Sequence, residues 1–195
     1  MSKIFEIRWH GRGGQGAKTA ALLFGESAMS TGKYFQAFPE YGPERMGAPV
    51  QAFNRLSDSP IILHCGIKEP DVVVVLDPTL LGSQPIMSGL KAEGAIIVNT
   101  TMDPKVLYNE LGVTTQKVFT VDASGISRAI LGRDLPNTPL LGALTKVLGI
   151  MTLDDLLSDI KKRLHKKFSD EVVEKNIQSI KKAYEEVQPQ SVRSK

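Results

Sequence analysis

The chain has 195 residues, of which 42% are hydrophobic, and its 24 Lys and Arg against 21 Asp and Glu give a formal net charge of +3. This size and apolar content predict a single domain, placed at residues 1–187, followed by a polar tail at 188–195. The mild charge argues against nucleic acid as a partner. No segment approaches the roughly 20 apolar residues of a membrane span, so we expect no membrane association and a cytoplasmic location.

The first predicted element is a short strand at residues 4–9 that leads into a glycine-rich turn and then a helix reaching to about residue 29. Glycines at the end of a first strand let the backbone turn sharply. They also leave amide N–H groups uncovered at a helix start, where the helix dipole favours an anion. The sequence therefore predicts a phosphate-binding turn, formed by Gly11, Arg12, Gly13, Gly14, Gln15, Gly16, Lys18 and Thr19.

Two familiar phosphate loops fit this turn only in part. The Gly-x-Gly-x-x-Gly spacing matches the dinucleotide fingerprint, but the acidic residue expected after the second strand is replaced only approximately, by Glu40. The triphosphate loop needs a lysine directly after its last glycine, and here Ala17 intervenes, which turns Lys18 by about 100° around the helix. A tight strand-to-helix turn with no ligand is the third interpretation.

A strand predicted at residues 34–38 leads into a loop at residues 39–49 that contains three prolines and two glycines. Such a loop can be a simple surface connection. However, proline-stiffened loops on a rigid scaffold commonly carry binding groups. We therefore expect the charged and aromatic side chains of this loop to form a ligand or partner surface beside the glycine turn, and these are Glu40, Tyr41, Glu44 and Arg45.

The middle of the chain alternates between strand and helix patterns. Residues 50–56 alternate apolar and polar residues with a period of two, which predicts a half-exposed strand at a sheet edge. Apolar runs rich in β-branched residues predict buried parallel strands at 72–76, 94–99 and 118–121, and helices are predicted from residue 103, at 123–131 and at 139–148. This alternation predicts a doubly wound, mostly parallel, Rossmann-like α/β sheet with helices on both faces.

Polar residues follow the buried strands, at the edge where open α/β sheets bind ligands. Asn99, Thr100 and Asp122 end strands and are expected to share this rim with the glycine turn. Asp77 closes another strand, and it either faces a ligand or caps the short segment after it. Asn137 precedes a helix, and it is either a helix cap or a ligand contact.

Cys65 is the only cysteine, which excludes an internal disulfide. One thiol cannot supply the roughly four protein ligands of a zinc ion or an iron–sulfur cluster, so we predict no metal site in this chain. Because Cys65 follows an apolar, strand-like run at residues 61–64, we expect it to be a small buried side chain. A reactive thiol is the alternative.

Two amphipathic helices are predicted near the C-terminus. The first carries an apolar stripe over residues 153–164, with Thr152 as its cap, and the second carries a stripe over residues 173–187 after Ser169. Their many lysines are most simply a solvated face that complements the helix dipoles. Docking of an acidic partner is the alternative.

Several of these stretches together resemble the gamma subunits of the 2-oxoacid:ferredoxin oxidoreductases, and among them that of the pyruvate enzyme, pyruvate synthase. They are residues 7–16, 41–47, the strand ending at Asp77-Pro78, and 137–143. The resemblance runs from about residue 4 to residue 184. It implies a multi-subunit enzyme that oxidatively decarboxylates a 2-oxoacid, transfers the acyl group to coenzyme A and passes electrons through iron–sulfur clusters to ferredoxin.

The resemblance also implies a division of labour. Thiamine diphosphate, magnesium and the iron–sulfur clusters are expected on the alpha, beta and delta partner subunits, so this chain is not active alone and has no catalytic residue. Its single cysteine and the absence of a Gly-Asp-Gly diphosphate motif agree with this. By resemblance the gamma part borders the coenzyme A channel. The glycine turn, with Arg12, Lys18 and Asn137, is then expected to receive the phosphates of coenzyme A. The alternatives are a purely structural assembly subunit and an independent nucleotide-binding module.

Overall fold

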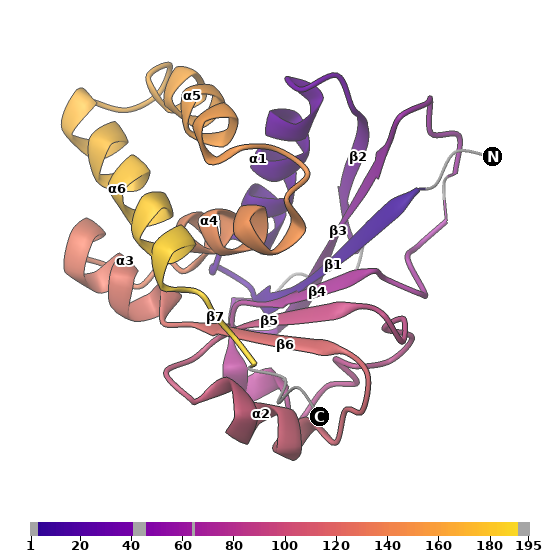
Figure 1. Ribbon diagram of the computed structural model, residues 1–195. Helices are drawn as coiled ribbons and strands as arrows, with labels where there is room; N and C mark the ends of the chain where they lie inside the picture. Colours follow the sequence, from indigo (N-terminus) through magenta and orange to yellow (C-terminus); the bar gives the residue numbers. More distant parts are fainter. Residues whose placement is uncertain (1–3, 41–45, 64, 191–195) are drawn as a thin grey trace.

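The computed structural model describes residues 4–40, 46–63 and 65–190 (Figure 1). Across these residues a seven-stranded sheet has the order β2-β3-β1-β4-β5-β6-β7. The strands are β1 (Phe5–Arg12), β2 (Tyr34–Pro39), β3 (Pro49–Ser57), β4 (Val72–Val75), β5 (Ala95–Asn99), β6 (Lys117–Val121) and β7 (Gln188–Pro189). Strands β1, β4, β5 and β6 are parallel to one another, whereas β2, β3 and β7 pair antiparallel with their neighbours.

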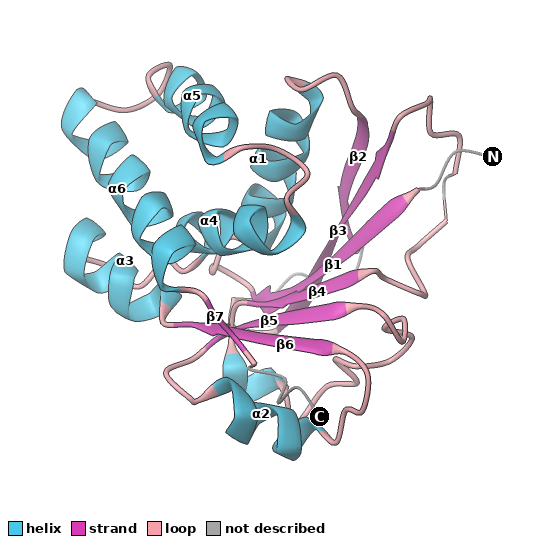
Figure 2. Ribbon diagram, viewed as in Figure 1, coloured by secondary structure: helices cyan, strands magenta, loops and turns pink. Residues whose placement is uncertain are grey.

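Helices cover the two faces of the sheet unequally (Figure 2). On one face lie α1 (Ala17–Met29), α3 (Ala123–Leu131), α4 (Asn137–Leu148), α5 (Leu153–Leu164) and α6 (Asp170–Glu186). On the other face lie α2 (Pro104–Leu111) and the short 3-10 turn η1 (Pro78–Leu80). The predicted doubly wound α/β fold with two C-terminal amphipathic helices is confirmed. Within the described ranges, no helix is both long and apolar enough to cross a membrane.

Strands β4 and β5 form the centre of the sheet, as their unbroken apolar sequences predict. All nine of their residues are buried. Val72 and Val74 pack into the core under α1 and α4, while Val73 and Val75 pack into a second core with Leu80 of η1 and Leu107 of α2. A strand covered on both faces has no solvent side, so it shows no polar alternation.

The prediction that residues 50–56 lie at a sheet edge is wrong. Strand β3 lies between β1 and β2, and its residues from Ala52 to Ser57 are buried. The polar positions that suggested exposure have partners inside the protein. Asn54 accepts a hydrogen bond from Trp9 Nε1 at 2.7 Å and donates one to Ala21 O at 2.7 Å, while the Arg55 guanidinium pairs with Glu6 at 2.9 Å. Polar residues on a buried strand are tolerated when their hydrogen bonds are satisfied.

The prediction that Cys65 is buried at the end of a strand is also wrong. Cys65 is exposed, residues 61–63 are not a strand, and Ile62 is 82% exposed. The cause is the buried Arg55, which donates to Cys65 O at 2.6 Å and to Gly66 O at 3.4 Å. Arg55 therefore holds this segment by its backbone carbonyls, and the apolar Ile62 is exposed to solvent.

The C-terminal helices follow their sequence signals closely. Thr152 and Asp155 form a capping box at the start of α5, and the apolar stripe of α6 is buried against α4. Gly142 makes this packing possible, since a Cβ there would lie 2.0 Å from the Ile180 carbonyl oxygen. Lys161 of α5 pairs with Glu174 of α6, and two lysines of α6 pair with glutamates of the same helix, as on a solvated face. The first two residues of the predicted polar tail pair with β6 as β7.

Candidate functional site

The glycine turn joins the end of β1 to the start of α1. Gly14 and Gly16 have φ values of 98° and 83°, a left-handed conformation that favours glycine. Gly16 is the N-cap residue in this conformation, and α1 begins at Ala17. The first turn of α1 holds no acidic residue, and Gly16 supplies no side-chain cap. The first amides of a helix have no intrahelical partners, so this end of α1 is a positive end suited to an anion.

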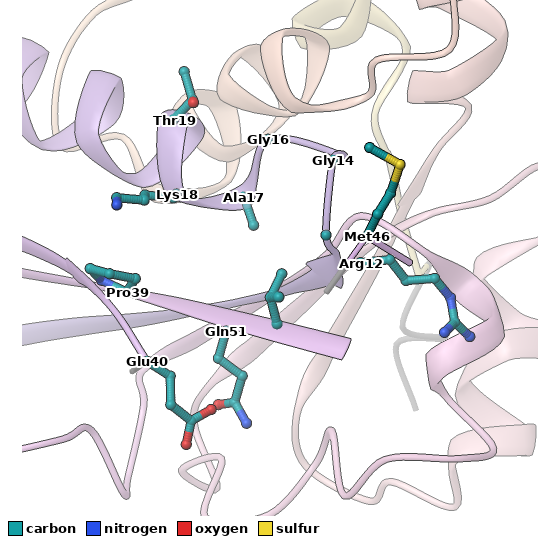
Figure 3. Close-up of a pocket in the computed structure, with 12 residues that line it drawn as sticks. Arg12, Gly14, Gly16, Ala17, Lys18, Thr19, Pro39, Glu40, Met46 and Gln51 are labelled. Atoms are coloured by element: carbon teal, nitrogen blue, oxygen red, sulfur yellow. The ribbon is translucent and has the colours of Figure 1, made fainter. Parts of the chain in front are cut away.

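A pocket of about 500 Å³ opens beside this turn (Figure 3). It lies toward β2 and β3 rather than toward β4. Its lining consists of Arg12, Gly13, Gly14, Gly16, Ala17, Lys18, Thr19, Pro39, Glu40, Met46, Val50 and Gln51. The structure thus brings most of the predicted phosphate turn together with Glu40. Tyr41, Glu44 and Arg45 lie outside the described residues.

The two cations of the turn have different surroundings. Their side chains point in opposite directions from the turn (Figure 3). The Arg12 guanidinium contacts Asp77 Oδ2 at 3.1 Å, Thr79 Oγ1 at 2.8 Å and Gly47 O at 3.1 Å, so its charge is used within the chain. Lys18 is exposed and has no ion pair with any described residue. Among the described residues, Lys18 is therefore the cation of this pocket whose charge is not already paired.

Gln15 and Gly11 were predicted as ligand contacts, and neither lines the pocket. The Gln15 side chain accepts a hydrogen bond from Arg12 N at 2.8 Å and donates one to Asp77 Oδ2 at 2.9 Å, which closes the turn on itself. Gly11 lies in β1, where an added Cβ would be 3.3 Å from Leu76 Cβ. Both residues shape the turn from within.

Asn137, the first residue of α4, packs directly against the glycine turn. A Cβ on Gly16 would lie 2.6 Å from Asn137 Nδ2. Asn137 is only 9% exposed, and its Oδ1 is buried with no hydrogen-bond partner among the described residues. No side-chain cap bond marks the start of α4. Of the two predicted roles, a helix cap is therefore not observed, and the side chain instead lies behind the turn with an unused acceptor.

Replacing Gly16 by alanine is expected to lower the free energy of unfolding by about 2 kcal/mol, because alanine is strained at this φ and its Cβ collides with Asn137. Equilibrium unfolding in urea measures this. Gly66→Ala is the control, since no atom lies within 4 Å of its Cβ position and its φ is ordinary. Adding Asn137→Ala to Gly16→Ala should recover the part of the loss that is due to the collision. If Gly16→Ala and Gly66→Ala had the same free energy of unfolding, this account would be contradicted.

The residues predicted at the rim act mainly as caps and braces. Asn99 donates to Leu76 O at 2.7 Å and accepts from Ser124 N at 3.0 Å, which joins β4 to the start of α3. Asp122 caps α3 by accepting from Gly125 N at 2.7 Å, and the Thr100 hydroxyl accepts from the Met102 amide. None of these three predicted residues lines the pocket beside the glycine turn.

Of the two predicted roles of Asp77, the cap is observed, and Asp77 does not line the pocket beside the glycine turn. It caps η1 by accepting from Thr79 N at 3.0 Å, and its other oxygen accepts from Arg12 and Gln15 of the glycine turn. Burial alone would raise the pKa of Asp77, but hydrogen bonds from Thr79 and Gln15 and the charge of Arg12 outweigh it and hold the pKa below its usual value. The Asp77 carboxylate is therefore ionised and binds both the start of η1 and the glycine turn.

The sequence analysis did not predict the buried, hydrogen-bonded pair Arg8 and His10 in β1. Arg8 Nε donates to His10 Nε2 at 2.9 Å, and Arg8 Nη2 donates to the carbonyls of Ile86 and Ser88 at 2.8 and 2.6 Å. Burial, and secondly the charge of Arg8, lower the pKa of His10 to about 3, so the imidazole is neutral. The available signal was the alternation of Arg8 and His10 with apolar Ile7 and Trp9, which places both polar side chains on one face of the strand.

Metal ligands do not gather in the described part of the chain, where no group of three or more His, Cys, Asp or Glu side chains is placed to hold an ion. Beside the pocket lie the first amides of α1, at the positive end of that helix, and Lys18, which has no ion pair among the described residues.

Known proteins with similar sequences and structures are subunits of oxidoreductases. The pyruvate synthase subunit PorC of Thermotoga maritima is 48% identical over 185 residues, which are 95% of each chain. The pyruvate/ketoisovalerate oxidoreductases common subunit gamma of Pyrococcus furiosus is 45% identical over 95% of this chain and 98% of that protein. The crystal structure of pyruvate oxidoreductase subunit PORC from Thermotoga maritima superposes with a TM-score of 0.85 at 44% identity, covering 97% of this chain and 99% of that one.

The sequence profile of the pyruvate ferredoxin/flavodoxin oxidoreductase family matches residues 6–186. This span includes the glycine turn, Asp77, Asn137 and both C-terminal helices. The resemblance to gamma subunits drawn from the sequence is confirmed by these similarities. The chain belongs to the pyruvate ferredoxin/flavodoxin oxidoreductase family.

Proposed function

We propose that this chain works as the gamma subunit of a pyruvate:ferredoxin oxidoreductase and that its glycine turn receives the phosphates of coenzyme A. The reaction converts a 2-oxoacid, most simply pyruvate, and coenzyme A to acyl-CoA, CO2 and reduced ferredoxin. The observation that carries the binding role is the positive N-terminus of α1, with no acidic residue in its first turn, beside a Lys18 that has no ion pair among the described residues, in a pocket of about 500 Å³. Relatives named as pyruvate oxidoreductase subunits support the choice of reaction.

Coenzyme A fits the chemistry of this pocket. Its diphosphate needs amide donors and a cation, which α1 and Lys18 supply without a neighbouring acidic cap. Glycines at positions 14 and 16 leave the backbone free of side chains where a phosphate would approach. Glu40 and Gln51 on the opposite wall are hydrogen-bonding groups suited to hydroxyls of the same ligand.

Thiamine diphosphate, magnesium and the iron–sulfur clusters are proposed to lie on alpha, beta and delta partner subunits, with ferredoxin as the electron acceptor of the complex. The single cysteine of this chain is too few ligands for an iron–sulfur cluster, which supports this division. A cytoplasmic location of the complex is part of the same proposal. Without these partners the chain has no catalytic group of its own.

An independent nucleotide-binding module has less support from the geometry. In the dinucleotide fold the acidic residue follows a second strand that is a parallel neighbour of the first. Here the antiparallel β3 lies between β1 and β2, so Glu40 ends a strand two positions away from β1. A purely structural assembly subunit is the alternative that the experiment below distinguishes.

Lys18→Glu is expected to raise the KM of the intact complex for coenzyme A at least tenfold, because it replaces a charge-assisted contact worth about 1.5–3 kcal/mol by repulsion. The KM for pyruvate is expected to stay within about twofold, since that substrate reacts elsewhere. Ferredoxin or viologen reduction at varied coenzyme A measures both. Lys105→Glu, an exposed lysine of α2 on the other face of the sheet, is the control. An unchanged KM for coenzyme A would favour the purely structural subunit.

A further inference from the structure

Strands β1 and β4 are adjacent and parallel. Strands β2 and β3, which follow β1 in the chain, lie on one side of this pair, and the strands that follow β4 lie on the other side. After β1 the chain enters α1 on one face, and after β4 it enters η1 on the other face (Figure 2). Open α/β sheets ordinarily bind ligands in the crevice at such a point. In this chain Arg12, the last residue of β1, and Asp77, just after β4, form an ion pair across this crevice at 3.1 Å. The pocket lies on the other side of β1, toward β3.

Asp77 is the centre of the contacts that fill this crevice. Its Oδ2 accepts from Arg12 Nε at 3.1 Å and from Gln15 Nε2 at 2.9 Å, and its Oδ1 accepts from the amide and hydroxyl of Thr79 at 3.0 and 2.6 Å. Its side chain is 13% exposed. Both oxygens of a mostly buried carboxylate are thus fully used in holding two different segments together.

Through Arg12 and Gln15, Asp77 controls both ends of the glycine turn. The Gln15 side chain accepts from Arg12 N, and Gln15 N donates to Arg12 O at 3.0 Å, so the two residues close a ring. The Arg12 guanidinium also reaches Gly47 O, and Gly13 exchanges hydrogen bonds with Gly47 and Ala48 at 3.1 and 2.9 Å. The Asp77 carboxylate therefore holds the glycine turn on the side that faces away from the pocket. Through Arg12 it also holds the segment at Gly47 and Ala48.

We propose that Asp77 is a positioning residue, which holds the glycine turn in the conformation that presents α1 and Lys18 to the pocket. This inference rests on the proposed binding of coenzyme A at the turn. Asp77 does not touch the ligand in this scheme, because it is not part of the pocket lining. Without it, Arg12 and Gln15 lose their common acceptor, and the turn must be ordered each time a ligand binds.

Asp77→Ala in the intact complex is expected to raise the KM for coenzyme A about tenfold, while kcat and the KM for pyruvate stay within about twofold. Asp77→Asn keeps an acceptor for Thr79 but faces Arg12 and Gln15 with an amide, so a smaller rise of a few-fold is expected. Asp103→Ala is the matched control. Asp103 also caps a helix, accepting from Lys105 N at 2.8 Å, but it has no contact with the glycine turn.

Hydrogen exchange of the peptide amides near residues 12–20 gives a second readout in the same complexes. We expect faster exchange in Asp77→Ala before coenzyme A is added, and wild-type protection when it is saturating. If Lys18→Glu raises the KM for coenzyme A and neither Asp77 variant does, the positioning role is overturned and the proposed binding site stands. If none of these variants changes the KM for coenzyme A, the positioning role and the proposed binding site are both overturned. Equal losses for coenzyme A and pyruvate, or a fall in kcat alone, would also overturn the positioning role.

Discussion

Replacing Trp9 by alanine is expected to remove about 5 kcal/mol of the free energy of unfolding, the largest effect of any single change considered for this chain. Trp9 lies in β1 with no exposed surface, and its ring meets that of Phe24 in α1 edge-on at 6.5 Å. Its indole N–H donates to Asn54 Oδ1 in β3 at 2.7 Å. The substitution leaves a large cavity and also leaves a buried acceptor without its donor.

The loss matters because Trp9 joins the three elements that carry the glycine turn and its pocket. A domain is stable by only about 5–15 kcal/mol, so much of the Trp9→Ala protein is expected to be unfolded at modest urea concentrations. Trp9→Phe keeps a ring but loses the N–H, and a smaller loss of about 1–3 kcal/mol is expected. Phe168→Ala, at a side chain that is 47% exposed, should change stability by less than about 0.5 kcal/mol. Similar urea midpoints for Trp9→Ala and Phe168→Ala would contradict the prediction.

Acid is expected to destabilise the chain through His10, by about 2 kcal/mol at pH 5 relative to neutral pH. Burial and the neighbouring Arg8 hold the pKa of the folded-state imidazole at about 3, whereas an unfolded histidine titrates near 6.5. Between these values the unfolded chain binds a proton that the folded chain does not. Stability is therefore fully present above pH 6.5 and falls as the pH is lowered toward 3.

The comparison that isolates this effect is His10→Gln, which can still accept a hydrogen bond from Arg8 but does not titrate. Urea unfolding of both proteins at pH 5 and pH 7 gives the difference for each. We expect the variant to be less stable at pH 7 because its packing is imperfect, yet to lose about 2 kcal/mol less than the wild type on acidification. The same acid loss in both proteins would show that His10 is not responsible.

Local signals predicted the elements that depend on neighbours in sequence. The valines of β4 indicate a strand covered on both faces, and Thr152 and Asp103 cap the helices that follow them. The glycine turn is likewise visible, because the left-handed conformations of Gly14 and Gly16 favour glycine. Periodicity, capping and backbone freedom act over a few residues, so a single sequence displays them directly.

Long-range pairing was not visible in the same way. Asn54 and Arg55 look like solvent-facing positions of an edge strand until Trp9 and Glu6, more than 40 residues earlier, are seen to satisfy them. Cys65 looks buried until Arg55 is seen to hold its carbonyl. In each case a polar group found its partner in a distant segment, and a pattern of apolar and polar residues does not record which partner a polar group has.

By itself, the amino-acid sequence determined the doubly wound α/β fold and the motifs of an oxidoreductase gamma subunit, and it predicted that the glycine turn binds phosphate. Only the tertiary structure decided how the charges of that turn are divided. Asp77, 65 residues after Arg12, pairs with the arginine beside the crevice between β1 and β4, whereas Lys18 has no ion pair among the described residues. The physical reason is that a carboxylate binds whichever donors the fold brings within about 3 Å, and only the folded chain sets that distance.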